Sequence, residues 1–371
     1  MQAVIERRRT RPVRVGDVTI GGTAPVSVQS MTKTDTCDVQ ATLGQIEELA
    51  GIGCQIIRCA VPDRPAARAL PRITAASSLP VVADIHYEHR LALAAVEAGA
   101  AGVRINPGNM RDREGLREFY RAAAEAGIKV RIGVNSGSIR PRKGLEVKEG
   151  ARGQDLAELM VEETLAYCRD AEEEGLGSLV LSLKASDVPT TVAAYRLAAD
   201  RCDYPFHVGV TAAGPPRDSL VKSAVGIGTL LAEGIGDTIR VSMTGPPAEE
   251  VRAGIAILES LELRRPTRPE IISCPTCARC QIDLPALVEE VARRLEHLPG
   301  GVKVAVMGCV VNGPGEAAEA DVGIAGGKSF GFLFRNGRKL KKVDAPDLAD
   351  AVVEEVTRIY SEETPERKRG Q

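Results

Sequence analysis

Short β-branched, apolar runs alternate with longer segments of helical period from about residue 25 to residue 243. The segments between the runs are rich in Ala, Leu, Glu and Arg, and several end in Gly, a common helix stop. Eight strand-then-helix units over this length predict an α/β fold, a (β/α)8 barrel of the TIM type rather than a doubly wound sheet. The predicted strands are 24–30, 55–61, 80–85, 102–106, 129–134, 178–183, 206–210 and 238–243.

A break in composition follows the last of these units. The stretch 264–270, RRPTRPE, has two prolines and three arginines and is typical of a linker. Beyond it, short strands and longer helices predict a smaller, C-terminal α+β domain. We therefore expect the barrel over 1–263, the linker over 264–270, the second domain over 271–360 and a flexible tail over 361–371.

Charge and composition narrow the classes of function. Lys and Arg total 48 against 50 Asp and Glu, so no global basic field favours nucleic acid or an anionic membrane. Aromatic residues make up 3% and Trp is absent, which weakens any model of base stacking. No uncharged run could span a bilayer, and the first residues lack the apolar segment of a signal peptide. We expect a cytoplasmic protein that binds neither nucleic acid nor membrane.

Cysteine spacing in the second domain indicates metal chemistry. Cys274, Cys277 and Cys280 form C-x-x-C-x-x-C, and Cys309 follows an apolar strand. Nine cysteines without a secretion signal argue against a disulfide framework. Three interpretations stay open here: an iron–sulfur cluster, which we favour, a structural zinc site of all four thiols, and unliganded thiols. The cysteines of the barrel are expected to pack as small hydrophobes.

Glu316 ends the sequence N-G-P-G-E, seven residues after Cys309, in a predicted loop. A carboxylate is a harder and more labile iron ligand than thiolate. A cluster held by three Cys and one Glu would therefore leave one iron open to a substrate oxygen, whereas four thiolates suit electron transfer. The alternative is a solvated loop residue, and spacing alone does not exclude it.

Polar residues stand at the predicted carboxyl ends of the barrel strands, where (β/α)8 enzymes have their active sites. Five are cations: Arg58, Arg104, Arg131, Lys184 and Arg240. An Arg within an apolar strand is costly to bury without a partner, and phosphate is a bidentate partner for Arg. We therefore predict a phosphate or diphosphate ester as ligand. The other polar residues at these ends are Asp84, His86, Asn106, Asn135, His207 and Ser242.

Eight segments carry a resemblance to a known family. They are VQSMTKTDT (28–36), ADIH (83–86), VRINPGN (103–109), RIGVNSGS (131–138), SLKASDV (182–188), VKSAVGIGTLLAEGIGDTIRVS (221–242), ISCPTCAR (272–279) and GCVVNGPGEAAEADVGIAGG (308–327). The chain resembles, nearly end to end, the bacterial 4-hydroxy-3-methylbut-2-enyl diphosphate synthases of the non-mevalonate isoprenoid pathway.

The resemblance implies an activity. The barrel would bind 2-C-methyl-D-erythritol 2,4-cyclodiphosphate, and the C-terminal domain would carry one 4Fe-4S cluster per chain. Reductive ring opening with loss of water would give 4-hydroxy-3-methylbut-2-enyl diphosphate. Ferredoxin or flavodoxin would deliver the electrons one at a time. The enzymes of this family act as homodimers in which the cluster of one subunit covers the barrel mouth of the other.

The resemblance also implies roles for individual residues. The cluster ligands fall on Cys274, Cys277, Cys309 and Glu316, which leaves Cys280 as an extra thiol. The diphosphate contacts fall on Arg58, Arg104, Arg131, Lys184 and Arg240. Candidates for hydrogen bonds to substrate are His86, Asn106, Asn135, His207, Ser242 and Asn312, and the catalytic candidates are Glu316 and Asn312.

One position departs from the family pattern. Where the family usually reads T-E-A-G, this chain has Thr211-Ala212-Ala213-Gly214. The Glu proposed there as an acid or base is missing, so proton delivery must use another group or water, or activity is altered.

Three rival functions stay open. An iron–sulfur electron carrier would use Cys280 as its fourth thiolate. A zinc-dependent structural or nucleic-acid module fits the near-neutral charge and sparse aromatic residues poorly. A barrel enzyme that uses pterins would need no cluster.

Overall fold

The chain divides into two units, Met1–Arg264 and Arg265–Gln371, and the division falls at the start of the stretch predicted as a linker. The computed structural model describes residues 5–139, 153–211 and 214–367. Each unit has its own sheet and its own hydrophobic core.

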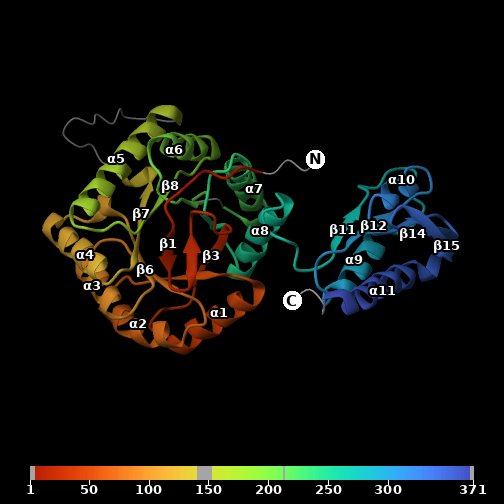
Figure 1. Ribbon diagram of the computed structural model, residues 1–371, viewed down its shortest axis with the longest axis horizontal. Helices are drawn as coiled ribbons and strands as arrows, with labels where there is room; N and C mark the ends of the chain where they lie inside the picture. The colour runs from red at the N-terminus through yellow and green to blue at the C-terminus, as the bar shows by residue number, and fades with distance from the viewer. Residues whose placement is uncertain (1–4, 140–152, 212–213, 368–371) are drawn as a thin grey trace. The chain divides into compact units, whose positions relative to one another are not determined.

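The first unit is a parallel barrel of eight strands, which confirms the predicted fold class (Figure 1). The strands follow one another around it in the order β8-β7-β6-β5-β4-β3-β10-β9. A parallel bridge between Leu181 and Phe206 brings the two ends of this series together, so the barrel is nearly closed. The strands are β3 (Ser27–Met31), β4 (Ile56–Ala60), β5 (Val81–Ile85), β6 (Gly102–Ile105), β7 (Lys129–Asn135), β8 (Leu179–Lys184), β9 (His207–Val208) and β10 (Thr238–Ile239).

Eight long helices surround these strands (Figure 1). Four of them begin at an Asp whose carboxylate accepts a hydrogen bond from a backbone N–H of the first turn, a strong N-terminal cap. The helices are α1 (Val39–Ile52), α2 (Arg64–Ala76), α3 (His89–Glu97), α4 (Arg113–Glu125), α5 (Gly153–Glu173), α6 (Val188–Arg201), α7 (Pro216–Ala232) and α8 (Pro247–Ser260), with short 3-10 turns η1 (Pro107–Asn109) and η2 (Ser136–Ser138).

The two-residue period of the strands separates an apolar outer layer from a polar interior. On β6, Val103 and Ile105 belong to the core between strands and helices, whereas Arg104 lies on the opposite face. The parallel register pairs Asp84 with Arg104 and Arg104 with Arg131, so these three side chains share the inner face. The alternation of side chains along the strands therefore places these charged residues inside the barrel.

A short hairpin at the N-terminus, which the sequence pattern did not predict, packs against the barrel. Strands β1 (Val13–Val15) and β2 (Val18–Ile20) pair antiparallel around Gly16, whose φ is +61°. Val15 and Ile20 form a small separate core with Ile56 and Val82, near the starts of β4 and β5. The hairpin thus covers the amino ends of the strands, opposite the predicted site.

The second unit is an α+β domain with one five-stranded sheet, in the order β11-β12-β13-β14-β15. The first three strands are parallel and the last three antiparallel. Helices α9 and α11 pack on one face through the larger core, and α10 packs on the other face. The elements are β11 (Glu270–Ser273), α9 (Leu284–Leu295), β12 (Lys303–Met307), α10 (Gly313–Ala318), β13 (Val322–Gly326), β14 (Phe330–Arg335), β15 (Arg338–Asp344), η3 (Ala345–Asp347) and α11 (Leu348–Arg367).

Two local predictions for this unit need correction. Helix α11 continues to Arg367, so most of the segment 361–371 expected as a flexible tail is helical, and 368–371 lie outside the described residues. The loop predicted around Glu316 contains the short helix α10, with Pro314 in its first turn, where a missing N–H costs nothing.

Among the described residues, no helix combines the length and the hydropathy needed to cross a membrane.

Candidate functional site

The structure brings five cations together at the carboxyl ends of the barrel strands. Arg58 lies on β4, Arg104 on β6, Arg131 on β7, Lys184 at the end of β8 and Arg240 directly after β10. They line a cavity of ≈ 140 Å³. The cavity is also lined by Asp84, His86, Asn135, Ser182, Thr211 and Ser242. We call it the mouth cavity.

Two glycines on the inner face make room for these side chains. A Cβ at Gly133 would lie 2.8 Å from Nε of Arg104, and one at Gly209 would lie 2.8 Å from Nζ of Lys184. Carbon atoms do not approach nitrogen so closely without displacing it. The absence of a side chain at these two positions therefore fixes where Arg104 and Lys184 can lie.

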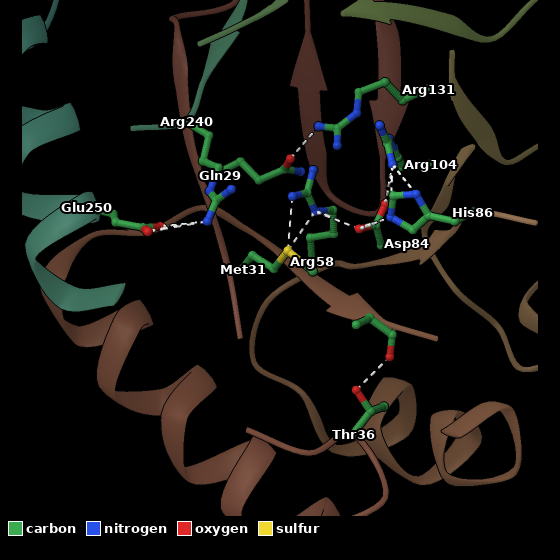
Figure 2. Close-up of polar contacts among 11 residues, drawn as sticks. Gln29, Met31, Thr36, Arg58, Asp84, His86, Arg104, Arg131, Arg240 and Glu250 are labelled. Carbon is green, nitrogen blue, oxygen red and sulfur yellow. Dashed lines mark hydrogen bonds and ion pairs between the residues drawn. The ribbon is translucent and has the colours of Figure 1, made fainter. Parts of the chain in front are cut away.

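Asp84 is a carboxylate that three residues of the mouth cavity share (Figure 2). It forms ion pairs with Nη1 of Arg104 at 3.2 Å and with Nε of Arg58 at 3.7 Å, and Nε2 of His86 lies 3.4 Å from it. Burial acts to raise the pKa of Asp84, but Arg58, His86 and Arg104 outweigh it and hold that pKa well below its usual range. These cations therefore favour the ionised form of Asp84.

A second carboxylate, that of Glu250 on helix α8, pairs with Arg240 (Figure 2). Nη2 of Arg240 lies 3.0 Å from Oε2 of Glu250, and Nζ of Lys33 lies 3.1 Å from the other oxygen. Glu250 is almost fully buried, so this carboxylate is divided between two cations. Burial lowers the pKa of Arg240, and Glu250 offsets part of that shift.

Arg131 and Lys184 form no ion pair with any described residue. Arg131 is 1% exposed, and its Nη1 donates a hydrogen bond to Oε1 of Gln29 at 2.6 Å. Burial, reinforced by Arg58 and other neighbouring cations, lowers the pKa values of Arg131 and Lys184 well below normal. Five cations thus face two carboxylates, and the mouth cavity favours binding of an anion.

The remaining candidates for substrate contact occupy different positions. His86, Asn135 and Ser242 line the mouth cavity. Asn106 and His207 are buried in the barrel, and neither belongs to the described residues that line the cavity. Ala212, where the family pattern has Glu, lies outside the described residues.

The cysteines assigned to the cluster lie at the carboxyl ends of two adjacent parallel strands. Cys274 follows β11 directly, and Cys309 lies just beyond β12, which pairs with β11. Cys277 is exposed and follows Thr276, which has the left-handed φ of +64°. Across the described residues, no three His, Cys, Asp or Glu side chains gather into a group that could hold a metal ion.

The chemistry of these donors nevertheless fits a cluster. Backbone N–H groups of Gly313, Val311 and Asn312 donate hydrogen bonds to the thiol of Cys309 and lower its pKa. They stabilise the thiolate, which is the form that binds iron. Glu316 is exposed in the first turn of α10, so its carboxylate is free to turn towards the same region.

Cys280 differs from the other thiols of the motif. Its Sγ donates a hydrogen bond to the carbonyl oxygen of Ile282 at 3.3 Å. A Cβ at Gly308 would lie 2.5 Å from its sulfur. Like Cys274, Cys280 also packs against the larger core of this unit, so the hydrogen bond to Ile282 is what distinguishes its thiol.

Three polar groups of the site were not assigned from sequence. Glu250 lies on α8, ten residues after Arg240, and no local sequence pattern indicates a contact between the two. Gln29 is uncharged, so the search for charged residues at the strand ends did not select it. Lys129 could have been found, because it precedes Arg131 by two residues and so shares the inner face of β7.

Comparisons with known proteins match both units of the chain. A family model for the GcpE TIM-barrel domain matches residues 10–255, and one for the GcpE protein C-terminal domain matches residues 270–358. A Geobacter sulfurreducens protein named 4-hydroxy-3-methylbut-2-en-1-yl diphosphate synthase (flavodoxin) is 54% identical over 96% of this chain and 99% of its own length. A Clostridium perfringens protein of the same name is 49% identical over 96% of this chain and all of its own.

Solved structures with a similar barrel are more distant. A dihydropteroate synthase from Coxiella burnetii has a TM-score of 0.49 at 12% identity, covering 68% of this chain and 99% of that one. One from Yersinia pestis has a TM-score of 0.48 at 12% identity, covering 68% of this chain and 97% of that one.

Replacing Asp84 tests whether an anion compensates the mouth cations. We expect Asp84→Asn to lower the free energy of unfolding by about 3 to 5 kcal/mol, because it leaves Arg58 and Arg104 buried without their shared carboxylate. Saturating pyrophosphate should restore more stability to this variant than it adds to the wild type. Thermal unfolding with and without pyrophosphate measures both effects.

The control is Glu114→Gln, which removes an exposed carboxylate paired with Arg121 and should change stability by less than about 1 kcal/mol. Equal stabilisation of the wild type and Asp84→Asn by pyrophosphate would mean that the anion does not act on these arginines.

Proposed function

The chain belongs to the GcpE family of 4-hydroxy-3-methylbut-2-en-1-yl diphosphate synthases, and we propose that it reduces 2-C-methyl-D-erythritol 2,4-cyclodiphosphate to 4-hydroxy-3-methylbut-2-enyl diphosphate in the non-mevalonate isoprenoid pathway. The observation that carries this proposal is the mouth cavity, which five cations line together with the single carboxylate of Asp84, while Glu250 pairs with Arg240 from helix α8. A cyclic diphosphate supplies the missing negative charge in a compact form.

The cations would bind and orient the substrate. Arg131 and Lys184, which have no carboxylate among the described residues, are the first candidates for the diphosphate oxygens. Arg58, Arg104 and Arg240 are held at the rim by Asp84 and Glu250, so they are pre-oriented before an anion arrives. Asn135 and Ser242 can add neutral hydrogen bonds at the same cavity.

A 4Fe-4S cluster would be held by Cys274, Cys277, Cys309 and Glu316. When bound, it would supply electrons one at a time to a substrate that must lose a hydroxyl group as water. The N–H groups around Cys309 support this assignment because they stabilise a thiolate ligand. Asn312 stands at the N-terminal end of α10 without a capping hydrogen bond, so its amide is available for a contact with substrate.

Flavodoxin is the proposed electron donor, because the names of the relatives include flavodoxin. Ferredoxin is the alternative from the same functional class. Cys277 and Glu316 are both exposed, which suits electron entry from a partner protein.

A four-thiolate electron carrier is the second candidate function. It requires Cys280 as a ligand, and the hydrogen bond of that thiol to the carbonyl oxygen of Ile282 does not favour this role.

Removing one cation should separate substrate binding from cluster binding. We expect Arg131→Ala to weaken binding of the cyclodiphosphate by about 1.5 to 3 kcal/mol, roughly ten- to hundredfold in Kd, through loss of a charge-assisted hydrogen bond. Iron and sulfide content should stay at the wild-type level. Calorimetric titration and metal analysis measure the two quantities.

Arg121→Ala is the matched control, because Arg121 is about half exposed and lies on the outer helix α4. Loss of iron from Arg131→Ala, or unchanged affinity, would contradict the assignment of the barrel to substrate binding.

Two variants distinguish Glu316 from Cys280 as the fourth ligand of the cluster. Cys280→Ser should leave iron content and turnover near the wild type. Glu316→Cys should assemble a cluster that turns over poorly, because a fourth thiolate holds the iron that a substrate oxygen must reach. Visible absorption and turnover of the cyclodiphosphate with reduced flavodoxin measure both. Cluster loss in Cys280→Ser, together with normal activity in Glu316→Ala, would support the electron carrier instead.

We also propose that the enzyme is a homodimer whose active site combines the barrel of one subunit with the cluster of the other. Mixing Cys309→Ser chains with Arg131→Ala chains should then restore activity, because a heterodimer has one site with both parts intact. Mass spectrometry must first show that subunits exchange. Exchange without any recovered turnover would contradict the shared site.

A further inference from the structure

A fully buried lysine lies inside the barrel, beyond the mouth cavity. Lys129 begins β7 and is 1% exposed, and Arg131, two residues later on the same face, lines the mouth. The side chain of Lys129 extends across Gly102 on β6, where a Cβ would lie 3.1 Å from its Cδ. No carboxylate forms an ion pair with it among the described residues.

A group of unpartnered polar atoms faces the same interior. The parallel register pairs Thr238 with both His207 and Ser27, so the three side chains share one face across β9, β10 and β3. Ser27 lies on the same face as Met31, which pairs with Arg58, and so the face is the inner one. Both ring nitrogens of His207 and the hydroxyls of Ser27 and Thr238 are buried without a hydrogen-bond partner in the described part of the chain.

Barrel interiors of this type are usually filled by branched apolar side chains. Here Lys129, His207, Ser27 and Thr238 put polar groups in that place, and we call them the inner polar layer. Buried polar groups without protein partners are normally satisfied by internal water or by a ligand. The layer is thus a place where protons can be held and exchanged.

The charges around this layer are almost all positive. Burial lowers the pKa of Lys129 well below normal, and Arg131 and Arg58 lower it further. Burial also lowers the pKa of His207, and the positive charges of four cations lower it further: Arg131, Lys184, Arg58 and Lys129. The buried carboxylates beside this layer already have partners. Asp84 and Glu250 are engaged by Arg58, Arg104, His86, Arg240 and Lys33. Asp237, next to Thr238, pairs with Arg7 and accepts a hydrogen bond from the backbone N–H of Phe206. Without an anion, burial and like charge therefore both favour the neutral forms of Lys129 and His207.

We propose that binding of a diphosphate at the mouth cavity draws protons into the inner polar layer, where Lys129 and His207 take them up. The proposal rests on the proposed function, since it needs the anion to bind among Arg58, Arg131 and Lys184. A ligand with several negative charges cancels the repulsion that these cations exert on Lys129 and His207. Anion binding and proton binding are then linked, and each strengthens the other.

Calorimetry of the full-length protein measures this linkage directly. Inorganic pyrophosphate is titrated near neutral pH in buffers of different ionisation enthalpy, which gives the number of protons taken up per bound anion. The wild type is compared with Lys129→Met, which keeps the length of the side chain and removes the amine. Protons exchanged by pyrophosphate itself are common to both proteins and cancel in the difference.

We expect the wild type to take up more protons than Lys129→Met, by about half to one proton per pyrophosphate. Lys303→Met, which removes a lysine with a 47% exposed side chain, should behave as the wild type. A parallel titration of the wild type with sulfate, whose charge is constant near neutral pH, should also show net uptake. This arm keeps the proposal testable if Lys129→Met does not fold.

Equal proton numbers in the wild type and Lys129→Met would overturn the inference while leaving the anion site intact. Absence of net uptake when sulfate binds the wild type would overturn it as well. Absence of pyrophosphate binding, or binding unaffected by Arg131→Ala, would overturn the proposed function and the inference together.

Discussion

The structure depends on an excess of buried positive charge at one end of a barrel. Strand alternation turns Arg58, Arg104 and Arg131 inward, and Lys184 and Arg240 join them at the strand ends. Asp84 and Glu250 are the carboxylates that face them, and both are already divided between several cations. Burying unpaired charge costs several kcal/mol of folding free energy. Favourable interactions elsewhere in the fold must therefore offset the cost of this mouth. A diphosphate removes that cost when it binds, which makes anion recognition part of the folding energetics.

Other features of the barrel serve this arrangement. Gly133, Gly209 and Gly102 each leave space that a cationic side chain of a neighbouring strand occupies. The N-terminal hairpin covers the amino ends of β4 and β5 with a small apolar core, at the end of the barrel opposite the cations.

Much of the fold could be predicted from the sequence, because eight β-branched runs spaced by helices leave few alternatives. The five cations were found because they stand at the predicted carboxyl ends of apolar strands, where an Arg is costly to bury without a partner. The hairpin β1–β2 was missed because its strands are three residues long and lie among arginines. Glu250 was missed because its partner Arg240 is set by packing of α8 against the barrel, which no local pattern encodes. The roles of the cluster residues stay predictions, since the described residues bring no three of the side chains that could hold a metal ion into one group.

The central claim is that the excess positive charge of the mouth cavity is the binding site of a diphosphate. A crystal structure of the protein with the cyclodiphosphate bound tests it most directly. The account predicts the diphosphate oxygens within hydrogen-bond distance of Arg131 and Lys184, with Arg58, Arg104 and Arg240 around them and Asp84 still paired with Arg104. A substrate bound elsewhere, with Arg131 and Lys184 still contacting only protein groups, would contradict it.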